Sequence, residues 1–355
     1  MKKIVVCFSI CLSALSFAQN NYPLISKIAF GSCADENLDQ PILSLILEHE
    51  HEHEPEPELF IYLGDNIYAD TKSIEELEEA YKKLGAKEEF QKLKLNIPII
   101  ATWDDHDYGW NDIGRHYELQ NESKKLFLNF FEVPKTSQRY NRKGIYDSYY
   151  FSDSKHTLQI ILLDERTFRD DLRIYNDELK DDESFFYKLD YFPHQNSDST
   201  MLGEEQWRWL EKELSTPADI RIIGSGTQFG VSFNVYEAWA NFPFEQKKLL
   251  DLIKKTNANG VIFISGDVHY AEISKVESEE LYPIYDITSS GITESWKFAT
   301  PNLNRIEGPV MDNNFGLITI DWNSDDPNIK MEIWDYRNNQ RIEHTISLSE
   351  ITFNK

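Results

Sequence analysis

Positive charge is scarce in this chain of 355 residues, which has 36 Lys and Arg residues against 61 Asp and Glu residues. A protein that coats nucleic acid needs a basic surface to neutralise phosphates, so this composition argues against that role. An anionic substrate would have to be attracted by a local positive feature, most simply a bound metal ion. Aromatic residues are plentiful, with 21 Phe, 18 Tyr and 8 Trp. They can fill a sizeable core and exclude disorder for most of the chain.

Long apolar runs are also missing, apart from a short one at the N-terminus. Lys2 and Lys3 precede the apolar stretch 4–17, and Ala18 closes a cleavage-site pattern of small residues. The stretch is shorter than the roughly 20 apolar residues that a membrane-spanning helix needs. We therefore predict a signal peptide over residues 1–18, a mature chain of 19–355 with no transmembrane segment, and a periplasmic or extracellular location.

Cysteine is nearly absent from the predicted mature chain. Cys7 and Cys11 would leave with the signal peptide, so Cys33 remains alone and cannot form an intrachain disulfide. Two interpretations stay open at this point: an inert, buried thiol, or a thiolate with a chemical role.

Another absence excludes a common class of hydrolase. There is no G-x-S-x-G turn, and Ser225, between Gly224 and Gly226, lacks the required spacing. A serine hydrolase of that type is therefore not indicated.

Apolar strand patterns alternate with amphipathic helical patterns through most of the chain, and the C-terminal part is strand-rich. The predicted strands are 25–31, 59–63, 97–103, 146–151, 158–163, 220–224, 261–265, 285–288, 315–322, 330–335 and 341–347. The predicted helices are 41–49, 73–85, 118–131, 202–214 and 244–255. This order predicts an α/β layered fold, and the lack of repeats or a clear linker favours a single domain.

Two segments have no regular pattern. The stretch 48–58 alternates Glu with His49, His51 and His53; we interpret it as a solvated acidic loop, with metal binding as the alternative. The acidic, aromatic stretch 176–199 is predicted to be a long loop that overhangs the site.

Four predicted strands end in side chains that can bind metals. These endings carry Cys33, Asp65 with Tyr68, Asp104 with Asp105 and His106, and Asp267 with His269. One Asp after a strand is usually a helix cap or turn residue. Recurrence after four strands indicates one metal site, because ligands in α/β folds bind beyond the carboxyl ends of strands.

The motifs G-D-x-x-Y, x-D-H-[DE] and G-x-x-H, in this order, resemble the calcineurin-like metallophosphoesterase superfamily. Within it, the chain is more similar to the PhoD-like alkaline phosphatase/phosphodiesterase family, from about Ile28 to Thr293. The resemblance rests on Gly31-Ser32-Cys33, Trp103-Asp104-Asp105-His106-Asp107, Leu163-Asp164-Glu165-Arg166, Leu202-Gly203-Glu204-Glu205-Gln206-Trp207, Gly266-Asp267-Val268-His269 and Thr288-Ser289-Ser290-Gly291. It implies a four-layer αββα metallophosphoesterase sandwich. Larger family members carry an N-terminal β-domain; here the motifs start within about ten residues of the predicted cleavage site, so substrate features contributed by that domain cannot be carried over.

The predicted ligands suggest which metals would bind. A Cys33 thiolate and a Tyr68 phenolate are both anionic, and keeping Tyr ionised at neutral pH requires a strongly Lewis-acidic ion, for which Fe³⁺ is the natural candidate. We assign Cys33, Asp65, Tyr68 and His269 to this ion, and by resemblance Asp65 would bridge to a second metal.

The second site is predicted to prefer hard cations. Asp105 stands where relatives place Asn, and Asp267 where they place His, so oxygen ligands dominate and favour one or two Ca²⁺ ions over Zn²⁺. Asp104, Asn111 and Gln228 are further candidates for ligands or substrate contacts.

A centre of this kind would hydrolyse phosphate mono- or diesters through a metal-bound hydroxide. His106 is the predicted general acid, with a structural bond to Asp107 as the alternative. Arg166 is predicted either to clamp phosphate or to pair with Asp164. The expected substrate is a small-molecule or lipid phosphoester, and no protein partner can be inferred. The alternatives are a phospholipase of the same type and a secreted, non-catalytic calcium- or carbohydrate-binding protein.

Overall fold

The computed structural model describes residues 21–48, 56–174, 191–232 and 236–353. The predicted signal peptide, the three histidines of the acidic loop and most of the 176–199 stretch lie outside these residues. No helix within the described ranges is both long and apolar enough to cross a bilayer.

One sheet of six strands has the order β16-β15-β14-β2-β3-β4. The strands β2, β3 and β4 are parallel, and β14, β15 and β16 add an antiparallel meander beside β2. The bounds are β2 Lys27–Gly31, β3 Leu59–Leu63, β4 Ile99–Thr102, β14 Asn314–Asp321, β15 Asn328–Asp335 and β16 Gln340–Ser347.

The second sheet has eight strands in the order β1-β5-β6-β9-β10-β12-β11-β13. Its central strands β6, β9, β10 and β12 are parallel, and β11 and β13 form an antiparallel edge. The bounds are β1 Asn21–Pro23, β5 Asp147–Ser152, β6 Thr157–Leu162, β9 Ile220–Ser225, β10 Val261–Ser265, β11 Ala271–Ser278, β12 Leu281–Ser289 and β13 Arg305–Val310.

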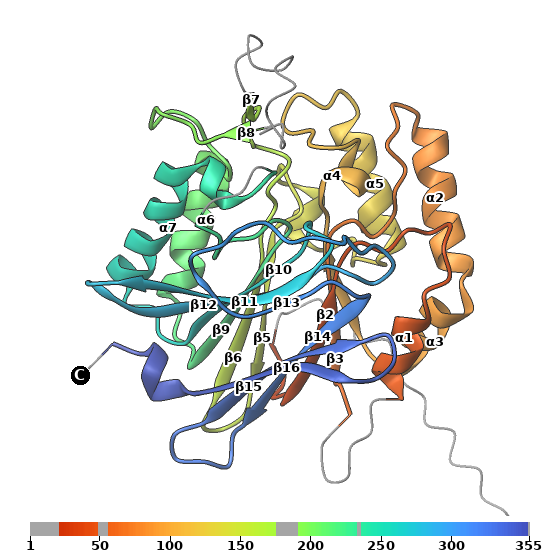
Figure 1. Cartoon of the computed structure of the whole chain (residues 1–355). Helices are drawn as coiled ribbons and strands as arrows, with labels where there is room; N and C mark the ends of the chain where they lie inside the picture. The colour runs from red at the N-terminus through yellow and green to blue at the C-terminus, as the bar shows by residue number, and fades with distance from the viewer. Residues whose placement is uncertain (1–20, 49–55, 175–190, 233–235, 354–355) are drawn as a thin grey trace, which may run out of the picture.

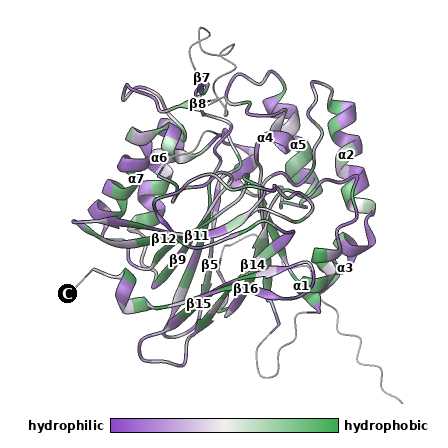
Figure 2. Ribbon diagram, viewed as in Figure 1, coloured by the Kyte–Doolittle hydropathy of each residue, from purple (hydrophilic) through white to green (hydrophobic). Residues whose placement is uncertain are grey.

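Helices cover the outer faces of both sheets, so the layers run helix, sheet, sheet, helix (Figure 1). The helices beside the six-stranded sheet are α1 Pro41–Leu47, α2 Ile74–Ala86, α3 Glu88–Asn96, the short α4 Asp105–Tyr108 and α5 Gln120–Phe130. Those beside the eight-stranded sheet are α6 Gly203–Ser215 and α7 Pro243–Thr256. The helices carry polar residues on their solvent faces and apolar residues toward the sheets (Figure 2). This arrangement confirms the predicted layered α/β fold.

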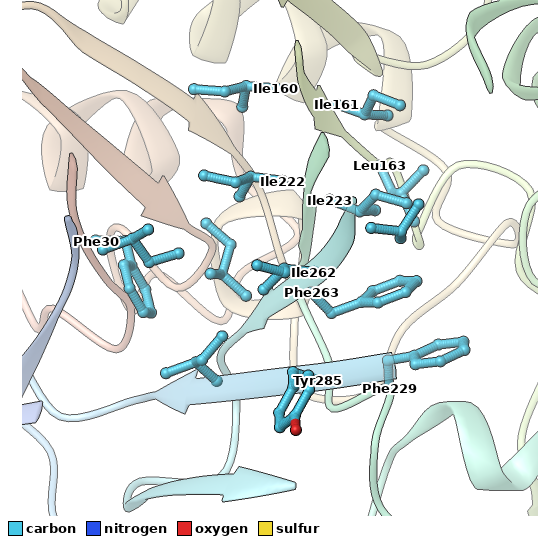
Figure 3. Close-up of a cluster of buried hydrophobic side chains, with 14 of the residues drawn as sticks. Phe30, Ile160, Ile161, Leu163, Ile222, Ile223, Phe229, Ile262, Phe263 and Tyr285 are labelled. Carbon is cyan, nitrogen blue, oxygen red and sulfur yellow. The ribbon is translucent and has the colours of Figure 1, made fainter. Parts of the chain in front are cut away.

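The main core lies between the two sheets and continues under α6 and α7. It joins Phe30 of the six-stranded sheet to Ile160, Ile222 and Ile262 of the other (Figure 3). Ile61 belongs to the same cluster. A second cluster packs the outer face of β2, β3 and β4 against α1, α2, α3 and α5. Because these parallel strands are covered on both faces, their sequences are almost continuously apolar. The parallel strands are therefore held rigidly, and their carboxyl ends can support a site.

Most predicted elements are present within a few residues of their predicted bounds, but five strands and two helices of the described residues were missed. The missed elements are β1, β11, β13, the short pair β7 Arg173–Ile174 and β8 Tyr191–Phe192, and the helices α3 and α4. Residues 191–192, predicted as loop, form the short strand β8 Tyr191–Phe192, which pairs with β7 Arg173–Ile174. The Ser73 hydroxyl caps α2 as expected by accepting a hydrogen bond from the Glu76 amide at 3.3 Å, but α2 continues past Gly85 to Ala86.

Candidate metal centre

The candidate site lies where the two sheets meet at the carboxyl ends of their parallel strands. Cys33 follows β2, Asp65 follows β3 and Asp104 follows β4, while Asp267 follows β10 of the other sheet. The two sheets are joined at this level by an isolated parallel bridge between Ser32 and Ser290. The fold thus brings together side chains that are far apart in the sequence.

Several of these residues have unusual backbone conformations. Cys33, Asp65, Asp267 and His269 all lie in the left-handed region, with φ of 62°, 49°, 76° and 54°. Non-glycine residues rarely adopt this conformation, and such strain concentrates at functional sites. Gly64 also has a positive φ, and a Cβ there would lie 2.4 Å from the Cβ of Asp104. Glycine at this position therefore allows the loops after β3 and β4 to approach each other.

The first group of potential ligands comprises Cys33, Asp65, Tyr68 and His269. The Cys33 thiol lies 3.4 Å from Asp65 Oδ2, and the Tyr68 hydroxyl lies 3.3 Å from the same oxygen. The Tyr68 hydroxyl is also 3.1 Å from His269 Nε2. Donor atoms of Cys33, Asp65 and His269 all lie within 4.8 Å of one another. Sulfur, oxygen and nitrogen donors thus surround one small volume.

The second group is made of carboxylates. Asp65, Asp104, Asp105 and Asp267 place one oxygen each within 4.8 Å of the others. Asp65 belongs to both groups, so it is positioned as a bridge between them. Asp65 Oδ1 and Asp104 Oδ2 are buried and accept no hydrogen bond from the described residues. Buried oxygens without donors are costly, and a bound cation would satisfy them.

The electrostatics of the site are also consistent with a bound cation. Burial raises the pKa of Asp65, Asp104 and Asp267, and repulsion from neighbouring carboxylates raises it further. Burial likewise raises the pKa of the Cys33 thiol to about 12 and that of the Tyr68 phenol above its usual range. A multivalent cation would reverse these shifts by stabilising the ionised ligands. The donor set therefore fits metal ions.

His106 projects beside both groups and contacts an acidic partner that the sequence analysis missed. Its Nδ1 lies 2.7 Å from Asp70 Oδ1, and its ring lies over Tyr68 with the centroids 4.3 Å apart. Although burial opposes the charged imidazole, the carboxylates of Asp105 and Asp65 raise the pKa of His106 to about 11. The predicted alternative, a bond to Asp107, is not present: the Asp107 carboxylate instead accepts from the Asp104 amide at 2.6 Å.

Arg166 is fully buried and is occupied by carboxylates of the site. Its Nε donates to Asp104 Oδ1 at 2.6 Å, and its Nη1 donates to Glu237 Oε2 at 2.6 Å. The predicted partner Asp164 accepts from the Arg166 backbone amide at 3.1 Å but not from its guanidinium. It also accepts from Trp103 Nε1 and from the Thr167 hydroxyl. The structure therefore places Arg166 behind the carboxylates, where it fixes their positions.

Two of the further candidates, Asn111 and Gln228, have hydrogen-bond partners of their own. Asn111 is exposed and donates to Asp112 Oδ2 at 2.6 Å. Gln228 is buried, and its amide donates to the Thr288 hydroxyl at 3.0 Å.

Sequence reasoning missed three other participants. Asp112 and Glu237 form a further acidic cluster with Asp105, and the Ser290 hydroxyl lies 3.0 Å from the Cys33 sulfur. Ser290 could have been noticed, since it lies in the T-S-S-G motif after β12. Asp112 and Glu237 follow no predicted strand, so no comparable signal marked them.

Comparisons with known proteins support the same assignment. The family model described as PhoD-like phosphatase matches residues 28–347. Alkaline phosphatase D of Bacillus subtilis (strain 168) is 26% identical over 216 residues, which cover 55% of this chain and 34% of that protein. The chain therefore matches about a third of the length of this curated relative.

Two solved structures share the fold. A structure of PhoD matches with a TM-score of 0.64 at 15% identity, covering 91% of this chain and 71% of the other. GAP50, described as the anchor in the inner membrane complex of Plasmodium, matches with a TM-score of 0.55 at 15% identity, covering 93% and 90%. At this identity the likeness concerns the fold alone.

Proposed function

The chain belongs to the PhoD-like phosphatase family, and from this membership we propose that it is a metal-dependent phosphoesterase that acts at the centre described above. The observation that carries the proposal is the convergence of Cys33, Asp65, Tyr68, Asp105 and His269 at one junction between two sheets. The signal-peptide pattern of residues 1–18 supports a periplasmic or extracellular enzyme.

We propose Fe³⁺ at the first group and one or two Ca²⁺ ions at the second. The thiol is buried and the phenol partly buried, both have raised pKa values, and a strongly Lewis-acidic ion would keep them ionised at neutral pH. The carboxylates Asp65, Asp104, Asp105 and Asp267 offer the hard oxygen donors that Ca²⁺ prefers. These ions would supply Lewis acidity toward the phosphate oxygens and toward water.

The other residues of the site have roles that follow from their contacts. His106 lies at the edge of the metal groups and is oriented by Asp70, so in its protonated form it is placed to donate a proton to the leaving oxygen. Arg166 holds Asp104 in place through a charge-assisted hydrogen bond and is itself held by Glu237. Arg166 and Glu237 therefore position the ligand Asp104 and do not need to touch the substrate.

The proposed substrates are small-molecule or lipid phosphoesters, which makes a phospholipase activity one form of the same proposal. The test is release of product from an aryl phosphate and from a bis-aryl phosphate by purified protein of measured metal content. Turnover that disappears on metal removal and returns with metal supports the proposal. Failure of the metal-loaded protein to hydrolyse either ester overturns it.

A further inference from the structure

A series of aromatic rings leads from the candidate metal centre toward the surface. The ring of Tyr68 lies 6.4 Å from that of His269, and His269 lies 5.0 Å from Trp296. Trp296 then stacks on Phe298, with the centroids 5.1 Å apart and the planes inclined by 17°. Tyr236 lies beside this pair, 4.8 Å from Trp296. The rings therefore start at a predicted metal ligand and end at an exposed side chain.

The segment 293–298 that carries Trp296 and Phe298 is tied to the loops that carry the predicted ligands. The Trp296 amide donates to the His269 carbonyl at 2.9 Å, and the Thr293 amide donates to the Cys33 carbonyl at 3.0 Å. The Thr293 hydroxyl also accepts from the Asp35 amide at 2.8 Å. These bonds fix the position of the two rings relative to the metal centre.

Core packing does not account for these two rings. Phe298 is 43% exposed and Trp296 is half-buried, whereas most large aromatic side chains of the described residues are buried in the two core clusters. Leaving an aromatic face in water forfeits the free energy that burial would provide. A stacked, partly exposed pair beside a catalytic centre is instead typical of a surface that receives a flat ligand.

We propose that Trp296 and Phe298, with Tyr236 beside them, form a stacking platform for phosphoesters that carry a planar aromatic ring. The inference rests on the proposed function, since the phosphate must be held at the metal centre for the ring to reach the platform. An aryl group or a nucleobase would meet this requirement, because both present a flat π-face. Stacking on an uncharged surface also suits a site whose surroundings are rich in carboxylates.

The experiment measures binding of non-hydrolysable probes to the metal-loaded protein by calorimetry. Phenylphosphonate is compared with cyclohexylphosphonate, which has a ring of similar size that is not planar. Stacking of a base on an aromatic side chain changes affinity by roughly 5- to 150-fold, so we expect wild-type protein to prefer the phenyl compound by about fivefold or more. Adenosine 5′-monophosphate against ribose 5-phosphate, with hydrolysis monitored, then distinguishes a nucleobase from an aryl group.

Leucine variants test the platform because leucine keeps an apolar contact but removes the π-face. Trp296→Leu and Phe298→Leu should each reduce the preference for the phenyl compound, and Trp296→Tyr should restore most of it. Phe244→Leu is the matched control, because Phe244 is 46% exposed and lies on α7. Since Trp296 contacts His269, metal content is measured for each variant; if Trp296→Leu loses metal, Phe298→Leu decides the result.

Equal affinity of wild-type protein for the phenyl and cyclohexyl compounds would overturn the platform, as would a preference that survives Phe298→Leu unchanged. Hydrolysis of simple phosphoesters without any such preference would leave the proposed function standing and reject the platform alone. A phenyl preference in a protein that hydrolyses no phosphoester would overturn the proposed function instead.

Discussion

Replacing Arg166 with methionine tests the buried ionic network behind the candidate metal centre. Methionine keeps much of the side-chain volume but removes the guanidinium that contacts Asp104 and Glu237, each at 2.6 Å. Glu237 retains Arg169, whose Nε lies 2.9 Å from Oε1, whereas Asp104 is left beside the carboxylates of Asp105 and Asp267.

The expected loss of stability is large because the ion pairs of Arg166 are buried away from water. Removing one partner of a buried ion pair costs about 3–5 kcal/mol, since the remaining charge is left uncompensated. We expect Arg166→Met to lower the free energy of unfolding of metal-depleted protein by about that amount, and by less in metal-loaded protein, where a cation shares the charge of Asp104. Urea unfolding followed by circular dichroism measures both values.

Lys247→Met provides the matched control. Lys247 and Asp251 form an exposed ion pair at 2.7 Å, one turn apart on α7, and such pairs contribute about 0–1 kcal/mol. If Arg166→Met lowers the free energy of unfolding no more than the control does, the ionic network does not stabilise the site. A stable Arg166→Met variant with a strongly raised KM would instead indicate that Arg166 clamps phosphate, the role that its burial argues against.

Four further predictions concern the metals, His106 and the pH dependence of stability. Dialysis against a calcium chelator should abolish turnover, and Ca²⁺ should restore it better than Zn²⁺. Full activity in protein free of calcium would contradict Ca²⁺ at the second group. Concentrated protein should show charge-transfer absorption in the visible region. Cys33→Ser should shift or bleach this band, and Tyr68→Phe should weaken it separately. A colourless, iron-free, fully active enzyme would reject Fe³⁺ at the first group. His106→Ala should lower turnover by roughly 10²–10⁴-fold while metal content stays intact, and stoichiometric metal loss would make His106 a ligand instead. Burial raises the pKa of Glu165 to about 7, so the folded state retains a proton that the unfolded state loses near pH 4.5; stability should therefore fall as the pH rises between these values, and Glu165→Gln should flatten that slope in urea unfolding.

The sequence predicted the fold best where buried parallel strands alternate with amphipathic helices. The runs of β3 and β10 were predicted at their observed bounds because strands covered on both faces are continuously apolar. The strand β13, with the sequence Arg-Ile-Glu-Gly-Pro-Val, was missed because it is a largely solvent-facing edge strand without a clear alternating pattern. Edge strands carry little periodic signal, since their neighbours and not their own residues decide their pairing.

The residues of the candidate site also include some that could be predicted from the sequence and some that could not. Cys33, Asp65, Asp105 and Asp267 could be predicted to meet, because each comes directly after a buried strand of a layered fold. Glu237 could not be predicted, because it lies in a loop and reaches the site only through tertiary packing against Arg166. The same packing explains why the Arg166 guanidinium pairs with Asp104, whereas Asp164, its near neighbour in sequence, accepts from Arg166 only through the backbone amide.

The proposed activity depends on one constellation at the junction of the two sheets, and Asp65 is the residue shared by both of its ligand groups. The most direct test compares wild-type protein with Asp65→Asn in the hydrolysis of a bis-aryl phosphate, with bound metal measured in the same samples. Wild-type protein should turn over and contain iron and calcium. Asp65→Asn should remain folded, lose most of its metal and lose turnover by at least about a hundredfold. An Asp65→Asn variant with wild-type turnover, or a metal-loaded wild type without any turnover, would contradict metal-dependent phosphoester hydrolysis at this centre.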